Sequence, residues 1–265
     1  MLTLAAPAGA SAQPSIAINN ACSFPIWIDQ TPNTGYSPLP SNNPSAAGKL
    51  ETGQTATYPI PAGGWAGRFW PKTGCDANGN NCVAGSSVSG CPPTGCEPPA
   101  DTKVEFNYPP QASDRPFYDI TLVDGYSLSA KITPSQTGGE RCTPTECAVS
   151  LAACPTDEIK GIGSLQVVRS GQVVQCLSPC KRWNYPAPYG LGRPETVPPG
   201  NLLCCPTPPV TPGECNDPMK GIVEKSQYVQ LVRRACPTAY SYTYDDLGGS
   251  HDCPPGTSFT VAFCQ

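Results

Sequence analysis

Histidine is almost missing from this chain of 265 residues, which contains only His251. A Ser-His-Asp hydrolase would need that histidine beside a nucleophilic serine, and the G-x-S-x-G elbow does not occur. A site built on several histidines is excluded as well, and no EF-hand spacing of carboxylates is present. We therefore expect neither a metal ion nor a cofactor, and we expect His251 to lie in an exposed loop.

Charge is also scarce, at 14% of residues with a formal net charge of -4. The basic pairs Lys181-Arg182 and Arg233-Arg234 are too small to follow a phosphate backbone, so nucleic acid is not an expected partner. A net negative chain also argues against a membrane-disrupting protein, which needs a cationic surface. No apolar run approaches the length of a membrane span, and no exposed apolar element demands a partner, so we expect a soluble monomer.

The N-terminus reads MLTLAAPAGASAQ and ends near Ala10-Ser11-Ala12, an A-x-A cleavage signature. The basic leader is missing and the apolar run is short. We interpret residues 1–13 as the remnant of a secretory signal peptide, with a merely disordered N-terminus as the alternative. The mature protein is then secreted and extracellular. It cannot rely on N-glycans, because Asn43-Pro44-Ser45 is excluded as a sequon by its proline.

Cysteine, proline and glycine are abundant instead, with 16, 34 and 26 residues. C-x-x-C is absent, which disfavours zinc ribbons and thioredoxin-type redox sites. An even number of cysteines in a secreted chain predicts eight disulfides, each worth about 2–4 kcal/mol of stability. Composition alone does not choose their pairing.

Alternating apolar and polar residues predict short β-strands in the first half of the chain and at its end. These segments are 14–20, 24–29, 54–61, 65–70, 103–108, 115–128 and 258–264. Residues 72–100 have four cysteines and no apolar periodicity, which is typical of a lobe held by disulfides. Together these segments predict an all-β sandwich or flattened barrel with a disulfide-rich appendage.

The second half of the chain carries fewer signals. Ser226 can cap a helix with one apolar stripe that ends at Cys236-Pro237, and residues 165–176 are typical of a hairpin. Residues 183–203, with five prolines and three glycines, predict a long loop.

The segment from Arg115 to Leu128 is the most informative strand, because it carries two carboxylates, Asp119 and Asp124. Five residues separate them, so an unbroken strand would place them on opposite faces. Both can line one cleft only if the chain bends or bulges at 123–125. Asp124 precedes a glycine, so it can alternatively be a simple turn residue.

Four stretches together resemble the thaumatin-like proteins, the family that includes the pathogenesis-related group 5 proteins. They are GRFWPKTGC at 67–75, FYDITLVDGY at 117–126, CPTAYSYTYDD at 236–246 and FTVAFC at 259–264. The order of the sixteen cysteines, with the adjacent pair Cys204-Cys205, fits the family too, and the resemblance extends from about residue 15 to residue 265.

This resemblance implies a thaumatin-like antiparallel β-sandwich core at 14–74, 103–147 and 236–265, a small stapled lobe at 75–102, and a disulfide-rich domain at 148–235. It also implies a disulfide pattern. The pairs are Cys22–Cys264, Cys75–Cys82, Cys91–Cys96, Cys142–Cys253, Cys147–Cys236, Cys154–Cys176, Cys180–Cys204 and Cys205–Cys215.

The resemblance further implies an acidic cleft between the core and the disulfide-rich domain. The residues that match the family pattern are Arg68, Glu105, Asp119, Asp124 and Asp245. Two departures bear on what such a cleft accepts: residues 83–90 lack the acid usual in the small lobe, and the 183–203 loop is longer than usual. Six aromatic side chains could either stack on sugar rings or pack against prolines: Tyr108, Phe117, Tyr126, Trp183, Tyr185 and Tyr189.

Hydrolysis of a glycosidic bond needs one protonated and one ionised carboxyl group. From the resemblance we expect a cleft that binds β-1,3-glucan or another cell-wall polysaccharide, with weak endo-β-1,3-glucanase activity as a further expectation. Glu105 would be the proton donor and Asp124 the base or nucleophile. The residues suit binding as well as hydrolysis, so two alternatives stay open: a non-catalytic defence or antifungal protein, and a structural secreted protein with a vestigial cleft.

Overall fold

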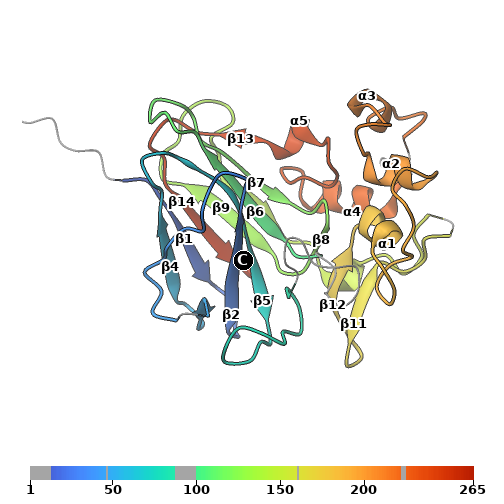
Figure 1. Ribbon diagram of the computed structural model, residues 1–265, viewed down its shortest axis with the longest axis horizontal. Coiled ribbons are helices and arrows are strands. Elements are labelled where there is room, and N and C mark those ends of the chain that lie inside the picture. Colours follow the sequence, from blue (N-terminus) through green and yellow to red (C-terminus); the bar gives the residue numbers. More distant parts are fainter. Residues whose placement is uncertain (1–12, 46, 87–99, 160, 222–224) are drawn as a thin grey trace, which may run out of the picture.

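The computed structural model describes residues 13–265 except 46, 87–99, 160 and 222–224. Two β-sheets pack face to face, and a smaller sheet with several short helices lies beside them (Figure 1). The fold is the predicted all-β class. The predicted division into three parts stays a prediction, and residues 1–12 of the signal peptide remnant and residues 87–99 of the small lobe fall outside the described residues.

One sheet has six strands in the order β13-β7-β6-β5-β2-β3. Their bounds are β2 Ile26–Pro32, β3 Lys49–Leu50, β5 Trp65–Thr73, β6 Lys103–Tyr108, β7 Phe117–Thr121 and β13 His251–Asp252. All described pairs in this sheet are antiparallel. Its strands alternate between core and surface because one face packs on the second sheet, as the sequence pattern predicted.

The second sheet has five strands in the order β10-β9-β14-β1-β4. Their bounds are β1 Ser15–Asn20, β4 Thr55–Pro59, β9 Ala130–Pro134, β10 Thr145–Cys147 and β14 Phe259–Phe263. The strand from each end of the chain lies at its centre, where β1 and β14 pair in parallel. That parallel pair departs from the otherwise antiparallel core.

Aromatic side chains fill the space between the two sheets. Phe259 of β14 lies 5.4 Å from Phe106 and 4.6 Å from Tyr118, measured between ring centroids. Tyr58 of β4 lies 4.7 Å from Phe69 of β5 in the same way. Burial of large aromatic rings is the main stabilising term of such a core, so the outer face of β5, β6 and β7 is left for polar residues.

A third sheet, in the order β11-β12-β8, joins the core to the disulfide-rich part. It comprises β8 Gly125–Tyr126, β11 Gln166–Arg169 and β12 Gln172–Leu177. The helices follow or flank it: the 3-10 helix η1 Leu151–Ala153, α1 Pro179–Asn184, α2 Gly200–Cys204, α3 Pro212–Cys215, α4 Gln227–Ala235 and α5 Asp246–Gly249. The longest of the described helices, α4, has nine residues, and none of them has the length and apolar character that a membrane span requires.

Seven disulfides are present, and each is one that the family resemblance implied. The eighth expected pair, Cys91–Cys96, lies outside the described residues. Cys22–Cys264 ties the first strand to the last across 242 residues of sequence. Closing such long loops stabilises the fold mainly by restricting the unfolded chain.

Two expectations from the sequence were wrong. His251 is buried rather than exposed, because β13 pairs with β7 and the imidazole packs 5.2 Å from the ring of Tyr118. The 183–203 segment is not a loop throughout: its first residues end α1, and its last residues lie in α2. Ser178 caps α1 with Pro179 following it, a start signal that the proline-rich composition obscured.

Candidate functional site

Three charged residues form a row across the outer face of the six-stranded sheet. Arg68 of β5 pairs in register with Glu105 of β6, and Glu105 pairs in register with Asp119 of β7. Directly opposed residues have Cβ atoms about 4.5–5.5 Å apart. Their neighbours along the strands, Phe69 and Ile120, point into the core. The hydrophobic register therefore forces this row onto the open face.

Asp124 joins the same face only because the chain bends after β7. The strand ends at Thr121, and the amide of Gly125 closes a turn by donating to the carbonyl of Leu122 at 3.1 Å. Gly125 has φ of 145°, and a Cβ there would lie 2.2 Å from the carbonyl oxygen of Cys176. Only glycine fits this position. The bend required by strand parity is present.

The cleft on this face has a volume of about 360 Å³. Four of the five predicted residues line it. Its lining residues are Arg68, Lys103, Glu105, Asp119, Thr121, Val123, Asp124, Tyr240, Thr243 and Asp246.

Two smaller hollows continue the cleft at its ends. One, of about 220 Å³, shares Arg68, Glu105 and Asp119 with it and extends past Phe117 and Asn33. The other, of about 210 Å³, shares Val123, Asp124 and Thr243. We call the second one the helical pocket, because α1, α2 and α4 contribute to its wall. Because neighbouring hollows share lining residues, we call the three together the groove.

Asp119 sits where a carboxyl group is driven toward its protonated form. Burial raises the pKa of Asp119 well above its usual range, and the negative charges of Glu105 and Asp246 raise it further. Its Oδ1 atom is buried and has no hydrogen-bond partner among the described residues. A protonated carboxyl in such a place can donate its proton to a ligand.

Asp124 has the opposite environment. Its Oδ2 lies 3.0 Å from Lys103 Nζ, and its Oδ1 lies 3.2 Å from Lys181 Nζ. Burial by itself would raise the pKa of Asp124, but the two ammonium groups outweigh it and lower the pKa to about 2. Two carboxyl groups of one cleft thus favour opposite protonation states.

Asp245 is not in the cleft, although the sequence pattern placed it there. Its carboxylate is buried, pairs with Arg233 at 2.8 Å and accepts a hydrogen bond from the backbone amide of Ser241 at 3.2 Å. The next residue, Asp246, lines the cleft and accepts a hydrogen bond of 2.7 Å from Tyr240 Oη. Adjacent aspartates are indistinguishable in a local motif, and only the turn into α5 decides which one faces the groove.

Lys103 and Lys181 were missed by the sequence reasoning. Lys103 could have been found, since it lies two residues before Glu105 on the same strand and so shares its face. Lys181 could not, because it comes from α1, on the other side of the groove. Its pair with Asp124 links the core to the disulfide-rich part.

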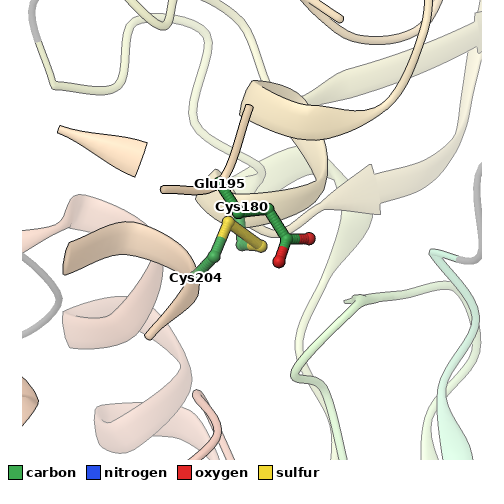
Figure 2. Close-up of side chains that lie close together, drawn as sticks. All are labelled: Cys180, Glu195 and Cys204. Carbon is green, nitrogen blue, oxygen red and sulfur yellow. A yellow bond between two sulfur atoms is a disulfide. The ribbon is translucent and has the colours of Figure 1, made fainter. Parts of the chain in front are cut away.

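Cys180, Cys204 and Glu195 lie close together at the wall of the helical pocket, where Figure 2 shows the Glu195 carboxylate beside two bonded sulfur atoms. Cys180 and Cys204 form a disulfide. A metal-binding cysteine must be a thiolate, so this trio is not a suitable metal site.

Comparison with known sequences identifies the family of this chain. The Thaumatin family model matches residues 20–265. A "Glucan endo-1,3-beta-glucosidase" of Prunus avium is 34% identical over 278 residues, covering 99% of this chain and 95% of that protein. "Pathogenesis-related protein 5" of Arabidopsis thaliana is 34% identical, covering 82% and 77%, and "Thaumatin-like protein 1" of the same plant is 30% identical, covering 94% and 85%. With the family model matched over nearly the whole chain, this protein belongs to the thaumatin family.

Proposed function

We propose that this protein is secreted, binds a β-1,3-glucan chain along the groove and hydrolyses it weakly at the central cleft. The observation that carries this proposal is a carboxyl group held protonated, Asp119, paired across the strands with a second carboxyl group, Glu105, in one open cleft. Glycosidases use such a pair, with one member as the acid and the other as the nucleophile or base. The name of the Prunus avium relative supports the substrate class.

Asp119 replaces Glu105 as the proposed proton donor. The raised pKa keeps the proton on Asp119, and its position beside Glu105 puts the second carboxyl group one strand away. Retaining glycosidases hold the carboxyl groups of acid and nucleophile about 5–5.5 Å apart, and directly paired cross-strand residues have Cβ atoms about 4.5–5.5 Å apart, so the register places both carboxyl groups in the same part of the cleft. We therefore assign the nucleophile role to Glu105, whose Oε1 lies 3.4 Å from Arg68 Nη1.

Asp124 then acts differently from the sequence-based expectation. Both of its oxygens are held by lysine ammonium groups, so it is a weak base and a hindered nucleophile. Its negative charge persists at any pH at which the acid Asp119 works, because its pKa is about 2. We assign it to hydrogen bonding of sugar hydroxyls and to stabilising positive charge that develops on the sugar ring in the transition state.

The outer end of the groove offers a stacking surface. Phe117 precedes Asp119 by two residues on β7, so it lies on the same face, and its side chain is 45% exposed. Sugar rings commonly pack their apolar faces on exposed aromatic rings. Phe117 thus extends the binding surface beyond the carboxyl pair.

Secretion is supported by the disulfides, since seven bridges are typical of an oxidising compartment. We also propose that the protein acts as a monomer, because the groove is formed within one chain.

A second candidate is a defence protein that binds cell-wall polysaccharide without cleaving it. One observation favours it: the lysines that neutralise Asp124 suit a permanent binding surface as well as a catalytic one. The name of one Arabidopsis thaliana relative, "Pathogenesis-related protein 5", also supports a role in defence.

The test is co-sedimentation with an insoluble linear β-1,3-glucan, together with reducing-sugar release, for wild type and Glu105→Gln. Glu146→Gln is the matched control, because Glu146 is a strongly exposed glutamate on the five-stranded sheet. We expect wild type and control to bind and release sugar, and Glu105→Gln to bind without release. Binding by wild type without any release would leave the second candidate, and no binding would reject both.

A further inference from the structure

We propose that the helical pocket is a subsite for one additional pyranose unit of the glucan, and that Glu195 is the residue that recognises its hydroxyl groups. This inference rests on the proposed function and concerns the part of the groove beyond the carboxyl pair. It assigns a role to the 185–199 loop between α1 and α2, where the sequence departs from the family pattern.

The pocket is placed to receive the next sugar of a chain bound at the cleft. It shares Val123, Asp124 and Thr243 with the central cleft, so the two spaces meet at Asp124. At about 210 Å³ it is smaller than the cleft, at about 360 Å³. A space of that kind suits a single ring better than a further length of polymer.

The wall of the pocket combines the two features that a sugar ring requires. Its apolar surface comes from Pro179, Leu203, Val229 and the Cys180–Cys204 disulfide. Pyranose rings have apolar C–H faces and a rim of hydroxyl groups, so a pocket that binds one needs both apolar surface and placed polar groups. Glu195 is the charged group that the loop adds.

Packing of the loop fixes Glu195 in position. The preceding residue, Pro194, accepts a hydrogen bond of 3.0 Å from Trp183 Nε1, and Arg193 packs its guanidinium 4.8 Å from the same indole ring. Gly200 lies so close that a Cβ there would be 2.1 Å from Trp183 Nε1. The loop is therefore anchored on the buried Trp183, immediately before and after the segment that carries Glu195.

Asn184, which does not line the pocket, donates a hydrogen bond from its Nδ2 to Glu195 Oε1 and so orients the carboxylate. Figure 2 shows that carboxylate beside the disulfide, at the wall formed by α1 and α2. The second polar group is Lys181, which forms an ion pair with Asp124 where the pocket adjoins the cleft. A sugar ring against the disulfide would thus meet both groups. Its hydroxyls could donate hydrogen bonds to the Glu195 carboxylate and accept them from the Lys181 ammonium group.

The pyranose unit can come from two sources. It can be the end of a linear β-1,3-glucan chain, or a single glucosyl branch on a chain that passes the cleft. Both present the same ring, so the chemistry of the pocket does not depend on the source. Calorimetric binding to three ligand sets separates them: short linear β-1,3-gluco-oligosaccharides, longer ones, and linear chains with one β-1,6-glucosyl branch.

Wild type, Glu195→Gln and the charge-matched control Glu146→Gln are compared. Glutamine at 195 keeps an acceptor for Asn184 and removes the charge that would bind sugar hydroxyls. We expect one ligand, either the longer linear chain or the branched chain, to bind wild type and control about tenfold more tightly than the short chain. That gain should vanish in Glu195→Gln, while the affinity for the short chain stays the same.

A gain with the longer chain assigns the pocket to a chain end, and a gain with the branched chain assigns it to a branch. Equal affinities of wild type for all three ligands, or a gain that survives in Glu195→Gln, would overturn the inference and leave the proposed function intact. Failure of wild type to bind any of the three would overturn both. Circular dichroism checks that each variant is folded.

Discussion

Glu105 and Asp119 face each other as directly paired residues of β6 and β7, and the charge of Glu105 helps to keep Asp119 protonated. The protonation state of Asp119, the proposed acid, therefore depends on its neighbour, so replacing Glu105 would lower the pKa of Asp119 as well as remove the proposed nucleophile.

Asp119→Asn is expected to reduce glucan hydrolysis about 10²–10⁴-fold, the usual contribution of a general acid, with little change in glucan binding. Asparagine keeps the shape of the side chain and loses the transferable proton. Reducing-sugar release and co-sedimentation measure the two effects. For wild type, nuclear magnetic resonance of the first product should show retention of anomeric configuration; inversion would remove Glu105 from the nucleophile role.

Asp246→Asn is expected to move the alkaline limb of the pH–activity profile to lower pH. The charge of Asp246 contributes to the raised pKa of Asp119, so removing it lowers that pKa. Asp119 then loses its proton, and the enzyme its activity, at a lower pH. The measurement is kcat/KM on a soluble β-1,3-glucan across pH. Glu146→Gln should leave the limb in place, and an unshifted limb in Asp246→Asn would argue against Asp119 as the acid.

Asp124→Asn should lower the stability of the folded protein at pH 7, whereas Asp119→Asn should not. The folded pKa of Asp124 is about 2, below its unfolded value near 4, so its ionisation contributes about 2–3 kcal/mol above pH 4 that is lost as the pH falls toward 2. Asp119 has a raised pKa, so the stability it contributes is present at low pH and is lost as pH rises through that value.

Thermal unfolding at pH 2 and pH 7 measures this pair. We expect Asp124→Asn to be less stable than wild type at pH 7 and nearly equal to it at pH 2. Asp119→Asn should be at least as stable as wild type at pH 7. A loss of stability at pH 7 for both variants would contradict the assigned protonation states.

Gly125→Ala is expected to cost about 3 kcal/mol or more, because an added Cβ would meet the backbone oxygen of Cys176, which cannot move aside. Gly171→Ala is the control. Gly171 also has a positive φ, of 79°, but its Cβ would meet nothing within 4 Å, so only the conformational strain of about 1–2 kcal/mol applies. Chemical denaturation of both variants gives the difference, and equal costs would show that the contact with Cys176 is unimportant.

The strands of the core could be predicted from local pattern. Segment 103–108 was predicted with its observed bounds, and Ser226 caps α4 as expected, with its Oγ accepting from the Val229 amide at 3.0 Å. Such signals are local, because a strand that buries one face must alternate and a helix start must satisfy its own amides. The prediction of a loop at 183–203 was wrong because the many prolines there obscured the sequence signals of two short helices.

The residues of the candidate site also fall into two groups, those that local sequence patterns identified and those that they did not. Glu105 and Asp119 were identified by motif, and their common face follows from strand periodicity. Asp246 faces the cleft because of the turn before α5, and Lys181 reaches Asp124 from a helix that is distant in sequence. Neither placement can be predicted from the residues nearby in sequence. For that reason the proposal moves the donor role from Glu105 to Asp119 and the nucleophile role from Asp124 to Glu105, since burial and neighbouring charges set a pKa and a motif contains neither.

The sequence by itself determined the class of this protein: alternating strands, sixteen cysteines and a carboxylate pattern of one family, all of which depend on residue type and spacing. Only the tertiary structure decided that the bend at Gly125 brings Asp124 to the face of Asp119. It also decided that two lysines from different parts of the chain hold Asp124 ionised. Electrostatic environment is a property of distances in space, and those distances exist only after the chain has folded.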